Sequence, residues 1–187
     1  MMVRALALAA GAALVAPAVA QEAFDDLGGS FALTDQTGAI RTETDPEGHA
    51  QLLFFGYANC QEICSAALPL MGEVADILEA EGTPVTPVMV TVDPARDTVE
   101  DIGPPLEVFH NGFIGLTGTE DELQVAYDAF GIEFEELFID PFYGPVYAHG
   151  SFIYLLDAEG GVLTMLPPIL APDHMAEIIA ANIGETS

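Results

Sequence analysis

Short apolar runs, rich in aromatic and β-branched residues and separated by turn-forming residues, recur along the chain. Such runs predict β-strands. The expected strands are Phe31–Gly38, which ends in a turn, Gln51–Tyr57, Val85–Val92, Phe113–Leu116, Phe152–Leu156 and Val162–Leu166. Gln51–Tyr57 is almost entirely apolar, which predicts a central strand buried on both faces.

Three segments place apolar residues three and four positions apart, which is the spacing of one helix face. The expected helices are Ile63–Glu81, a helix that begins at Thr119, and Pro172–Ile183. Thr119 and Glu122 have the spacing of a capping box, and Gly131 is placed to end this second helix.

Two segments lack a regular pattern. Asp97–His110 is expected to be a broken helix with a loop, because Pro104 and Pro105 interrupt any helix. Glu133–Tyr147 is acidic, aromatic and interrupted by proline and glycine, so a long loop or flap is expected there.

The order of these segments predicts an α/β domain with strands inside and helices outside. A parallel strand–helix–strand unit is expected between residues 51 and 92. The length of 187 residues suits one domain, and the 51% of hydrophobic residues is enough to form its core.

The first twenty residues have the features of an export signal. A basic start precedes the apolar run Ala5–Val15, and Ala18–Ala20 has the small-x-small pattern of a cleavage site. We expect a signal peptide of residues 1–20, cleaved before Gln21, and a periplasmic domain of residues 21–187. The alternative is an uncleaved segment that anchors the domain in the inner membrane, facing the periplasm, although the run is short for a membrane span.

The charge of the chain is strongly unbalanced. Three Lys and Arg residues stand against 30 Asp and Glu residues, which gives a formal net charge of −27. This field repels nucleic acid and anionic lipid, so nucleic-acid binding is excluded and membrane contact is expected only through an uncleaved signal segment. It attracts cations and basic protein partners, and adaptation to a salty medium would explain the same composition.

The two cysteines of the chain, Cys60 and Cys64, lie where the first central strand gives way to its helix. At a spacing of four residues, two thiols share one face of a helical turn, so they can hold one metal ion or be oxidised to each other. The residues alone leave open a metal site, a redox pair and a plain disulfide. A closed zinc site would need four ligands, whereas thiolates with an imidazole suit copper.

Several blocks of sequence, in order, resemble the Sco (SenC/PrrC) family of thioredoxin-like copper chaperones. The blocks are Gly28–Gly38, Phe54–Cys64, Val90–Thr98, Phe113–Thr119 and His149–Gly160. The resemblance implies a thioredoxin-like fold with a central mixed β-sheet flanked by helices. It also implies that Cys60, Cys64 and His149 bind one copper ion, Cu(I) or Cu(II).

The resemblance further implies a role in the assembly of cytochrome c oxidase. The protein would take copper from a donor protein and deliver it to the binuclear copper centre of the apo-oxidase subunit. The alternative is a thiol-disulfide oxidoreductase that reduces the cysteines of a copper-site partner, with Cys60 attacking and Cys64 resolving. A general thioredoxin is disfavoured by the CxxxC spacing, and a peroxidase-like relative by the lack of its Thr/Cys/Arg constellation.

Three positions depart from the family pattern. Gln61 and Ser65 stand where the family has prolines after the two cysteines, and Ala148 stands where an aspartate precedes the histidine. The loss of a carboxylate beside a metal-binding histidine is expected to weaken copper binding.

The histidines and methionines of the chain differ in the roles expected for them. His149 precedes an expected strand, at a position where loop ends place functional side chains. Surface or packing roles are expected for His49, His110 and His174. Core packing is expected for Met71, Met89, Met165 and Met175.

Overall fold

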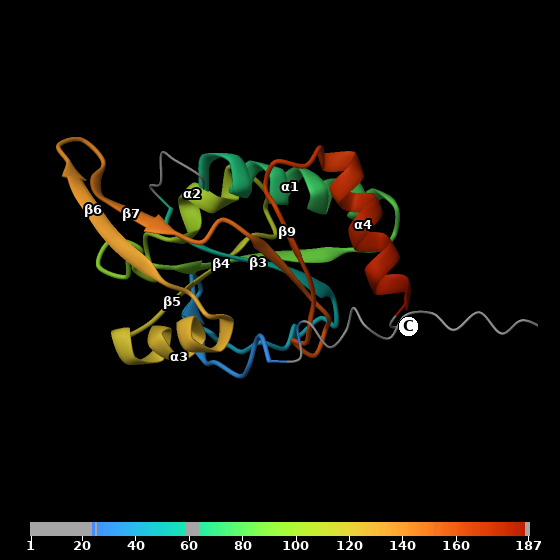
Figure 1. Ribbon diagram of the computed structural model, residues 1–187, viewed down its shortest axis with the longest axis horizontal. Helices are drawn as coiled ribbons and strands as arrows, with labels where there is room; N and C mark the ends of the chain where they lie inside the picture. The colour runs from blue at the N-terminus through green and yellow to red at the C-terminus, as the bar shows by residue number, and fades with distance from the viewer. Residues whose placement is uncertain (1–23, 25, 59–63, 186–187) are drawn as a thin grey trace, which may run out of the picture.

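The computed structural model describes residues 24, 26–58 and 64–185 of the chain (Figure 1). Its elements are β1 (Leu33–Asp35), β2 (Ile40–Arg41), β3 (Ala50–Gly56), α1 (Cys64–Ala80), β4 (Val85–Thr91), α2 (Gly103–Glu107), β5 (Ile114–Thr117), α3 (Glu120–Phe130), β6 (Phe134–Asp140), β7 (Gly144–His149), β8 (Ile153–Leu156), β9 (Val162–Leu166) and α4 (Pro172–Glu185). Within these residues the main sheet has the strand order β2-β1-β5-β4-β3-β8-β9, and β6 pairs with β7 in a separate sheet.

The main sheet is mixed, as the family resemblance implies. β3, β4 and β5 are parallel neighbours, whereas β1 and β8 run antiparallel to β5 and β3. α1 and α4 cover one face of the sheet and α3 covers the other (Figure 1). All seven residues of β3 are buried, which confirms the expected central strand.

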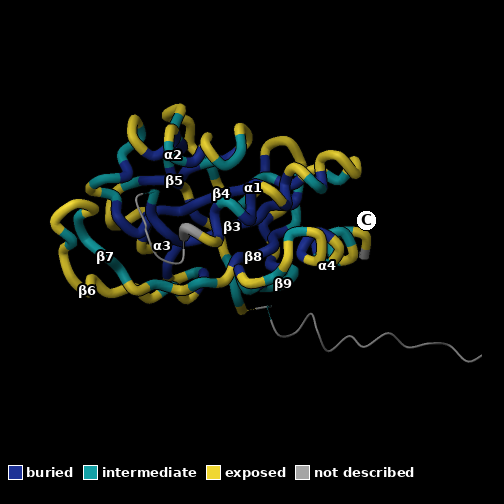
Figure 2. Tube along the Cα trace, turned by 90° about the horizontal axis from the view of Figure 1, so that it is seen from above, coloured by how far each residue is buried: buried dark blue, intermediate teal, exposed yellow. Residues whose placement is uncertain are grey.

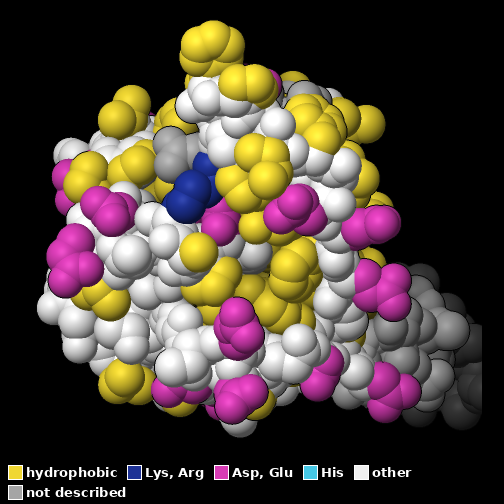
Figure 3. Space-filling model, turned by 90° about the vertical axis from the view of Figure 1, so that its left-hand side faces the viewer, with side chains coloured by type: hydrophobic (Ala, Val, Ile, Leu, Met, Phe, Trp, Pro, Cys, Tyr) yellow, Lys and Arg dark blue, Asp and Glu magenta, His cyan; other side chains and the backbone are white. Residues whose placement is uncertain are grey.

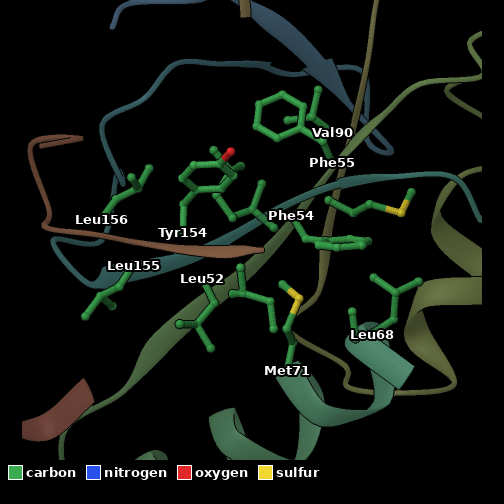
Figure 4. Close-up of a cluster of buried hydrophobic side chains, with 14 of the residues drawn as sticks. Leu52, Phe54, Phe55, Leu68, Met71, Val90, Tyr154, Leu155 and Leu156 are labelled. Carbon is green, nitrogen blue, oxygen red and sulfur yellow. The ribbon is translucent and has the colours of Figure 1, made fainter. Parts of the chain in front are cut away.

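The core fills both faces of this sheet. Met71 points from α1 toward the face that Leu52 occupies, and Phe55 and Tyr154 lie on the other face (Figure 4). On that second face, the Phe55 ring lies 5.4 Å from the ring of Phe130 in α3. Buried positions follow β3, β4 and β8, while β6 is exposed along its length (Figure 2). The expected α/β domain is therefore confirmed.

The local signals for the second expected helix are confirmed in detail. The Thr119 side chain accepts from the backbone N–H of Glu122, whose carboxylate accepts from the backbone N–H of Thr119. Gly131 ends α3 with a φ of 61°, in the left-handed region that glycine adopts without strain. The strand and helix at the C-terminus also lie within one or two residues of the expected bounds.

Three expectations need correction. Pro104 and Pro105 lie in the first turn of α2 rather than interrupting a helix, because a missing backbone N–H costs nothing there. The expected strand Phe31–Gly38 is shorter and pairs, as β1, with β2. The expected loop Glu133–Tyr147 is the β6–β7 hairpin.

The turn of the β6–β7 hairpin is formed by residues that the hydrophobic pattern does not identify as a turn between two strands. The Asp140 carboxylate accepts the backbone N–H groups of Phe142 at 2.8 Å and Tyr143 at 2.9 Å. Gly144 follows with a φ of 81°. Because β6 buries none of its seven residues, it lacks the apolar alternation that identifies a core strand.

The expected signal peptide lies outside the described residues. Among the helices of the described residues, none is both long enough and apolar enough to cross a bilayer.

Candidate functional site

The candidate site lies at the edge of the sheet where β3 and β4 end. Gly56 pairs with Thr91 at the last position of these parallel strands, and the backbone N–H of Val92 donates to the Gly56 carbonyl at 2.7 Å. Tyr57 and Ala58 then lead the chain toward the cysteines. In open α/β sheets, ligands bind outside this carboxyl edge.

The two cysteines of the candidate site are described only in part. Cys60 lies outside the described residues, and for Cys64 the structure describes the backbone alone, as the first residue of α1. The expected placement of Cys64 at a helix start is therefore confirmed. The described residue nearest to Cys60 on the preceding side is Ala58.

His149 lies beside the chain that leads to Cys60. It is the last residue of β7, so it lies in a strand and not only before the expected strand. Its imidazole lies 5.9 Å from the ring of Tyr57 and 5.8 Å from that of Phe54. Its Nδ1 is 2.8 Å from the Gly150 carbonyl oxygen. Since a carbonyl can only accept, the Nδ1 of His149 carries the proton and, in the neutral ring, Nε2 carries the lone pair. Metal-binding histidines have this arrangement.

Asp97 lies in the loop that follows β4, and it fixes the backbone just after the end of β3. Its carboxylate accepts the Ala58 backbone N–H at 3.1 Å and the Thr91 hydroxyl at 2.6 Å, and the residue is 2% exposed. Burial raises the pKa of Asp97, and the nearby Asp93 acts in the same direction. A buried carboxylate thus positions the backbone two residues before Cys60.

Arg96 ties the β6–β7 hairpin to the same loop. Its guanidinium pairs with the Asp93 carboxylate and donates to the backbone carbonyls of Tyr143 and Pro145, the latter at 3.0 Å. It also lies 5.7 Å from the centre of the Tyr57 ring. These contacts position β7, and hence His149, against the end of β3.

Tyr127 connects α3 to the end of β4 and to the start of the β6–β7 hairpin. Its hydroxyl donates to the Thr91 carbonyl at 2.6 Å, and its ring packs 5.1 Å from that of Phe134 in β6. Burial, and then the negative charge of Asp93 and Asp97, raises the pKa of Tyr127, so the hydroxyl remains a neutral donor. A groove of about 710 Å³ borders His149 between Tyr127 and the start of β6.

A second group of candidate ligands lies elsewhere, in a cavity of about 730 Å³ beside α1. Donor atoms of Asp76, Glu79 and His110 lie there within 4.8 Å of one another. The Nδ1 of His110 accepts the Gly112 backbone N–H at 3.0 Å, so Nε2 carries the proton and faces the Asp76 carboxylate at 3.5 Å. The His110 ring thus lies beside an exposed carboxylate, in agreement with its expected surface or packing role.

The burial of the methionine and histidine side chains tests the other expectations. The side chains of Met71, Met89 and Met175 are fully buried in the core, and Met165 packs against it. Core packing of the methionines is confirmed. His174 is exposed near the start of α4.

Sequence reasoning missed Asp93, Arg96 and Asp97 as site residues. They lie in Val90–Thr98, a block that carries the family resemblance but was given no role. The available signal was topological, since the carboxyl ends of two adjacent parallel strands meet at one edge of the sheet.

Comparison with known proteins agrees with this geometry. The family model described as SCO1/SenC matches residues 19–184. A SCO2-like protein of Rickettsia felis is 35% identical over 159 residues, covering 83% of this chain and 77% of the relative. The human mitochondrial SCO1 homologue is 32% identical over 159 residues, covering 84% of this chain and 53% of the relative.

Solved structures show the same fold. Arabidopsis thaliana ScoI with copper bound has a TM-score of 0.79 at 27% identity, covering 85% of this chain and 99% of that chain. Yeast Sco1 with copper bound has a TM-score of 0.76 at 30% identity, covering 85% and 89%. The mixed sheet, with a cysteine at the start of the helix after its central strand, defines a thioredoxin-like protein. Within that class, the chain belongs to the SCO1/SenC family.

Proposed function

We propose that this protein is a copper chaperone that delivers copper to the binuclear copper centre of cytochrome c oxidase. Membership of the SCO1/SenC family supports the proposal. So do the relatives solved with copper bound, ScoI of Arabidopsis thaliana and of Bradyrhizobium japonicum and Sco1 of yeast.

The proposed ligands are Cys60, Cys64 and His149. The observation that carries this proposal is the tautomer of His149, whose Nδ1–H bond to Gly150 leaves the lone pair on Nε2. Two thiolates and one imidazole form a soft donor set of low coordination number, which suits Cu(I) and can also hold Cu(II) through the nitrogen. Copper is the cargo, and it moves to the acceptor by ligand exchange.

The surrounding residues would keep these ligands in place. Asp97 holds the backbone before Cys60, and Arg96 holds the strand that ends at His149. Ala148 is exposed on β7 opposite Glu135, so it supplies no carboxylate beside His149.

The proposed location is the periplasm, with residues 1–20 acting as a signal peptide. The alternative is an inner-membrane anchor that faces the periplasm. The proposed partners are a copper donor protein and the copper-centre subunit of cytochrome c oxidase. The net charge of −27 favours partners with basic surfaces.

A second candidate function is thiol-disulfide exchange with the copper site of the partner. The position of Cys64 as the first residue of α1 favours it, because a helix N-terminus stabilises a thiolate. In this reaction Cys60 attacks the partner's disulfide, one partner thiol leaves, and Cys64 then displaces the second. The partner gains two thiols, and this chain is left with a Cys60–Cys64 disulfide.

The test is a Cu(I) titration of the reduced protein against a competing chelator. Loss of outer contacts alone lowers metal affinity roughly 10–100-fold, so Cys60→Ser and Cys64→Ser should lower it by more than about 100-fold. His149→Ala should lower the affinity as well. His174→Ala, at an exposed position near the start of α4, is the matched control and should bind like wild type.

The outcome decides between the two functions. Tight Cu(I) binding that survives loss of either cysteine would contradict the three-ligand site. Weak binding by wild type, with rapid reduction of an oxidised oxidase copper domain, would favour thiol-disulfide exchange.

A further inference from the structure

We propose that the outer end of the β6–β7 hairpin docks the copper-exchange partner, which presents an apolar surface bordered by Lys and Arg residues. The exposed side chains that form this surface, called the apolar tip below, are Leu137, Phe138, Ile139, Phe142 and Tyr143. The identity of the partner rests on the proposed function, whereas the surface itself rests on the hairpin.

The apolar tip is an unusual surface. Phe142 is 90% exposed, and the other members are 52–67% exposed. Hydrophobic side chains gather on this side of the molecule, with acidic side chains around them (Figure 3). Contiguous exposed apolar patches, rimmed by polar residues, mark interaction sites in proteins that are otherwise well packed.

The base of the hairpin is fixed while its outer end projects from the domain (Figure 1). Tyr147 packs 5.5 Å from the Tyr57 ring, and Phe134 packs 5.1 Å from the Tyr127 ring. At the turn, Arg96 donates to the Tyr143 and Pro145 carbonyls, so the backbone beside the apolar tip is fixed as well. A surface held in place before binding loses little entropy when it docks, which favours recognition.

The tip and His149 lie within reach of one partner. β7 runs from Gly144 at the turn to His149, and its five steps span about 17 Å at the usual rise of ~3.4 Å per residue. A standard interface buries about 800 Å² on each side and is roughly 30 Å across. A partner that covers the apolar tip can therefore also reach the Nε2 of His149.

The charge around the apolar tip identifies the chemistry of the partner. Residues 133–149 contain four carboxylates and no Lys or Arg, in a chain of net charge −27. The one basic side chain that contacts this hairpin among the described residues, Arg96, is paired with the Asp93 carboxylate. A second copy of the chain, with the same sign of charge, would be repelled, and so would an anionic lipid surface. A basic rim on the partner would instead speed association and set its orientation.

The experiment compares Phe138→Ser and Phe142→Ser with wild type. The probe is the metal-free copper-binding domain of a cytochrome c oxidase subunit, and the readouts are its dissociation constant without copper and the rate of Cu(I) transfer to it. Both variants should bind the probe about 10–100-fold more weakly, as expected for exposed aromatic anchors of an interface. Their own Cu(I) affinity should not change.

Two controls make the result specific. Ile169→Ser removes an apolar side chain that is 85% exposed outside the hairpin, and it should leave binding of the probe unchanged. Glu135→Lys reverses a charge on β6 and should slow association at low salt, with little effect on dissociation.

The outcomes separate this proposal from the proposed function. Normal binding of the probe by both Phe variants overturns the docking surface, whether or not copper is transferred. Tip-dependent binding without copper transfer supports the docking surface and contradicts delivery. No binding by wild type overturns both. Self-association, or binding to phosphatidylcholine vesicles, that is lost in Phe142→Ser would assign the tip to another occupant and overturn the proposal.

Discussion

The β6–β7 and β8–β9 hairpins use the same turn chemistry and have opposite surroundings. In each turn an aspartate accepts two backbone N–H groups: Asp140 those of Phe142 and Tyr143, and Asp157 those of Glu159 and Gly161. Each turn also contains a glycine with positive φ. All four residues of β8 are buried beside β3, whereas no residue of β6 is buried.

The difference shows that turn residues determine where the chain reverses, while burial determines what the hairpin does. β8–β9 completes the main sheet and stabilises the domain. β6–β7 carries His149 at one end and the apolar tip at the other, and it is held by side chains from neighbouring loops. The first hairpin is a part of the core, and the second is a part of the proposed site.

The largest expected effect separates the two hairpins by stability. Leu155→Ala in β8 removes a fully buried side chain and should lower the free energy of unfolding by about 2–5 kcal/mol. Leu137→Ala in β6 removes the same atoms from an exposed position and should change it by less than about 0.5 kcal/mol. Denaturant unfolding measures both. Equal losses would show that β6–β7 contributes to the core as β8–β9 does.

A smaller effect should distinguish the two turns. Gly144→Ala and Gly160→Ala each force alanine to positive φ, which costs about 1 kcal/mol or more. The new Cβ at Gly160 would lie 2.9 Å from the Glu43 carbonyl oxygen, and that at Gly144 would lie 3.1 Å from the Arg96 guanidinium carbon. Both variants should be less stable, but only Gly144→Ala should also lower Cu(I) affinity, because it displaces Arg96.

Chelator competition and thermal unfolding on the same samples test this pair. An equal fall in Cu(I) affinity for both variants would mean that general destabilisation, rather than the contact with Arg96, controls the metal site.

The smallest effect is a change in how stability depends on pH. Burial raises the pKa of Asp97 above its unfolded value of about 3.8. This carboxyl group therefore stabilises the folded state below pH 3.8, and its contribution is lost as the pH rises through the folded pKa. Asp97→Asn should remove this loss. Asp35 is the control of opposite sign: its burial is outweighed by hydrogen bonds from Thr37 and Arg41, which lower its pKa. Its contribution is present above pH 3.8 and is lost as pH falls.

Urea unfolding from pH 3 to 7 gives the slopes for wild type, Asp97→Asn and Asp35→Asn. Slopes that change in the same direction for both variants would contradict the assigned burial and hydrogen bonding. The comparison tests whether the loop after β4, which holds Asp97, and β1, which holds Asp35, shift the pKa of a carboxyl group in opposite directions.

The same two hairpins show which parts of the fold the sequence predicts. The strands of β8–β9 were expected because Phe152–Leu156 and Val162–Leu166 are apolar and flank a glycine-containing turn. β6–β7 was expected to be a loop, because its exposed strands carry no apolar alternation and contain Pro145. Patterns of apolar residues identify strands that are buried in the core. They miss exposed strands such as β6 and β7.

The site was predictable to a similar extent. The sequence predicts Cys60, Cys64 and His149 as ligands, the cysteines from their positions and His149 mainly from the family resemblance, and this stays a prediction. The roles of Arg96 and Asp97 were not predicted, because their partners are backbone groups: the carbonyls of β7 and the N–H of Ala58. Backbone groups leave no mark in the sequence, so contacts between a side chain and distant backbone are found only in the folded structure.

The position of Arg96 also makes the hairpin accessible to a simple protease assay. The chain contains no lysine, so within residues 21–187 trypsin can cut only after Arg41 and Arg96. Cutting after Arg96 requires its guanidinium to leave the carbonyls of Tyr143 and Pro145, so the contact between this loop and the hairpin must first open. When opening and closing are fast, the cleavage rate measures the free energy of this local opening. Cleavage after Arg96 therefore reports how firmly this loop holds the strand that ends at His149.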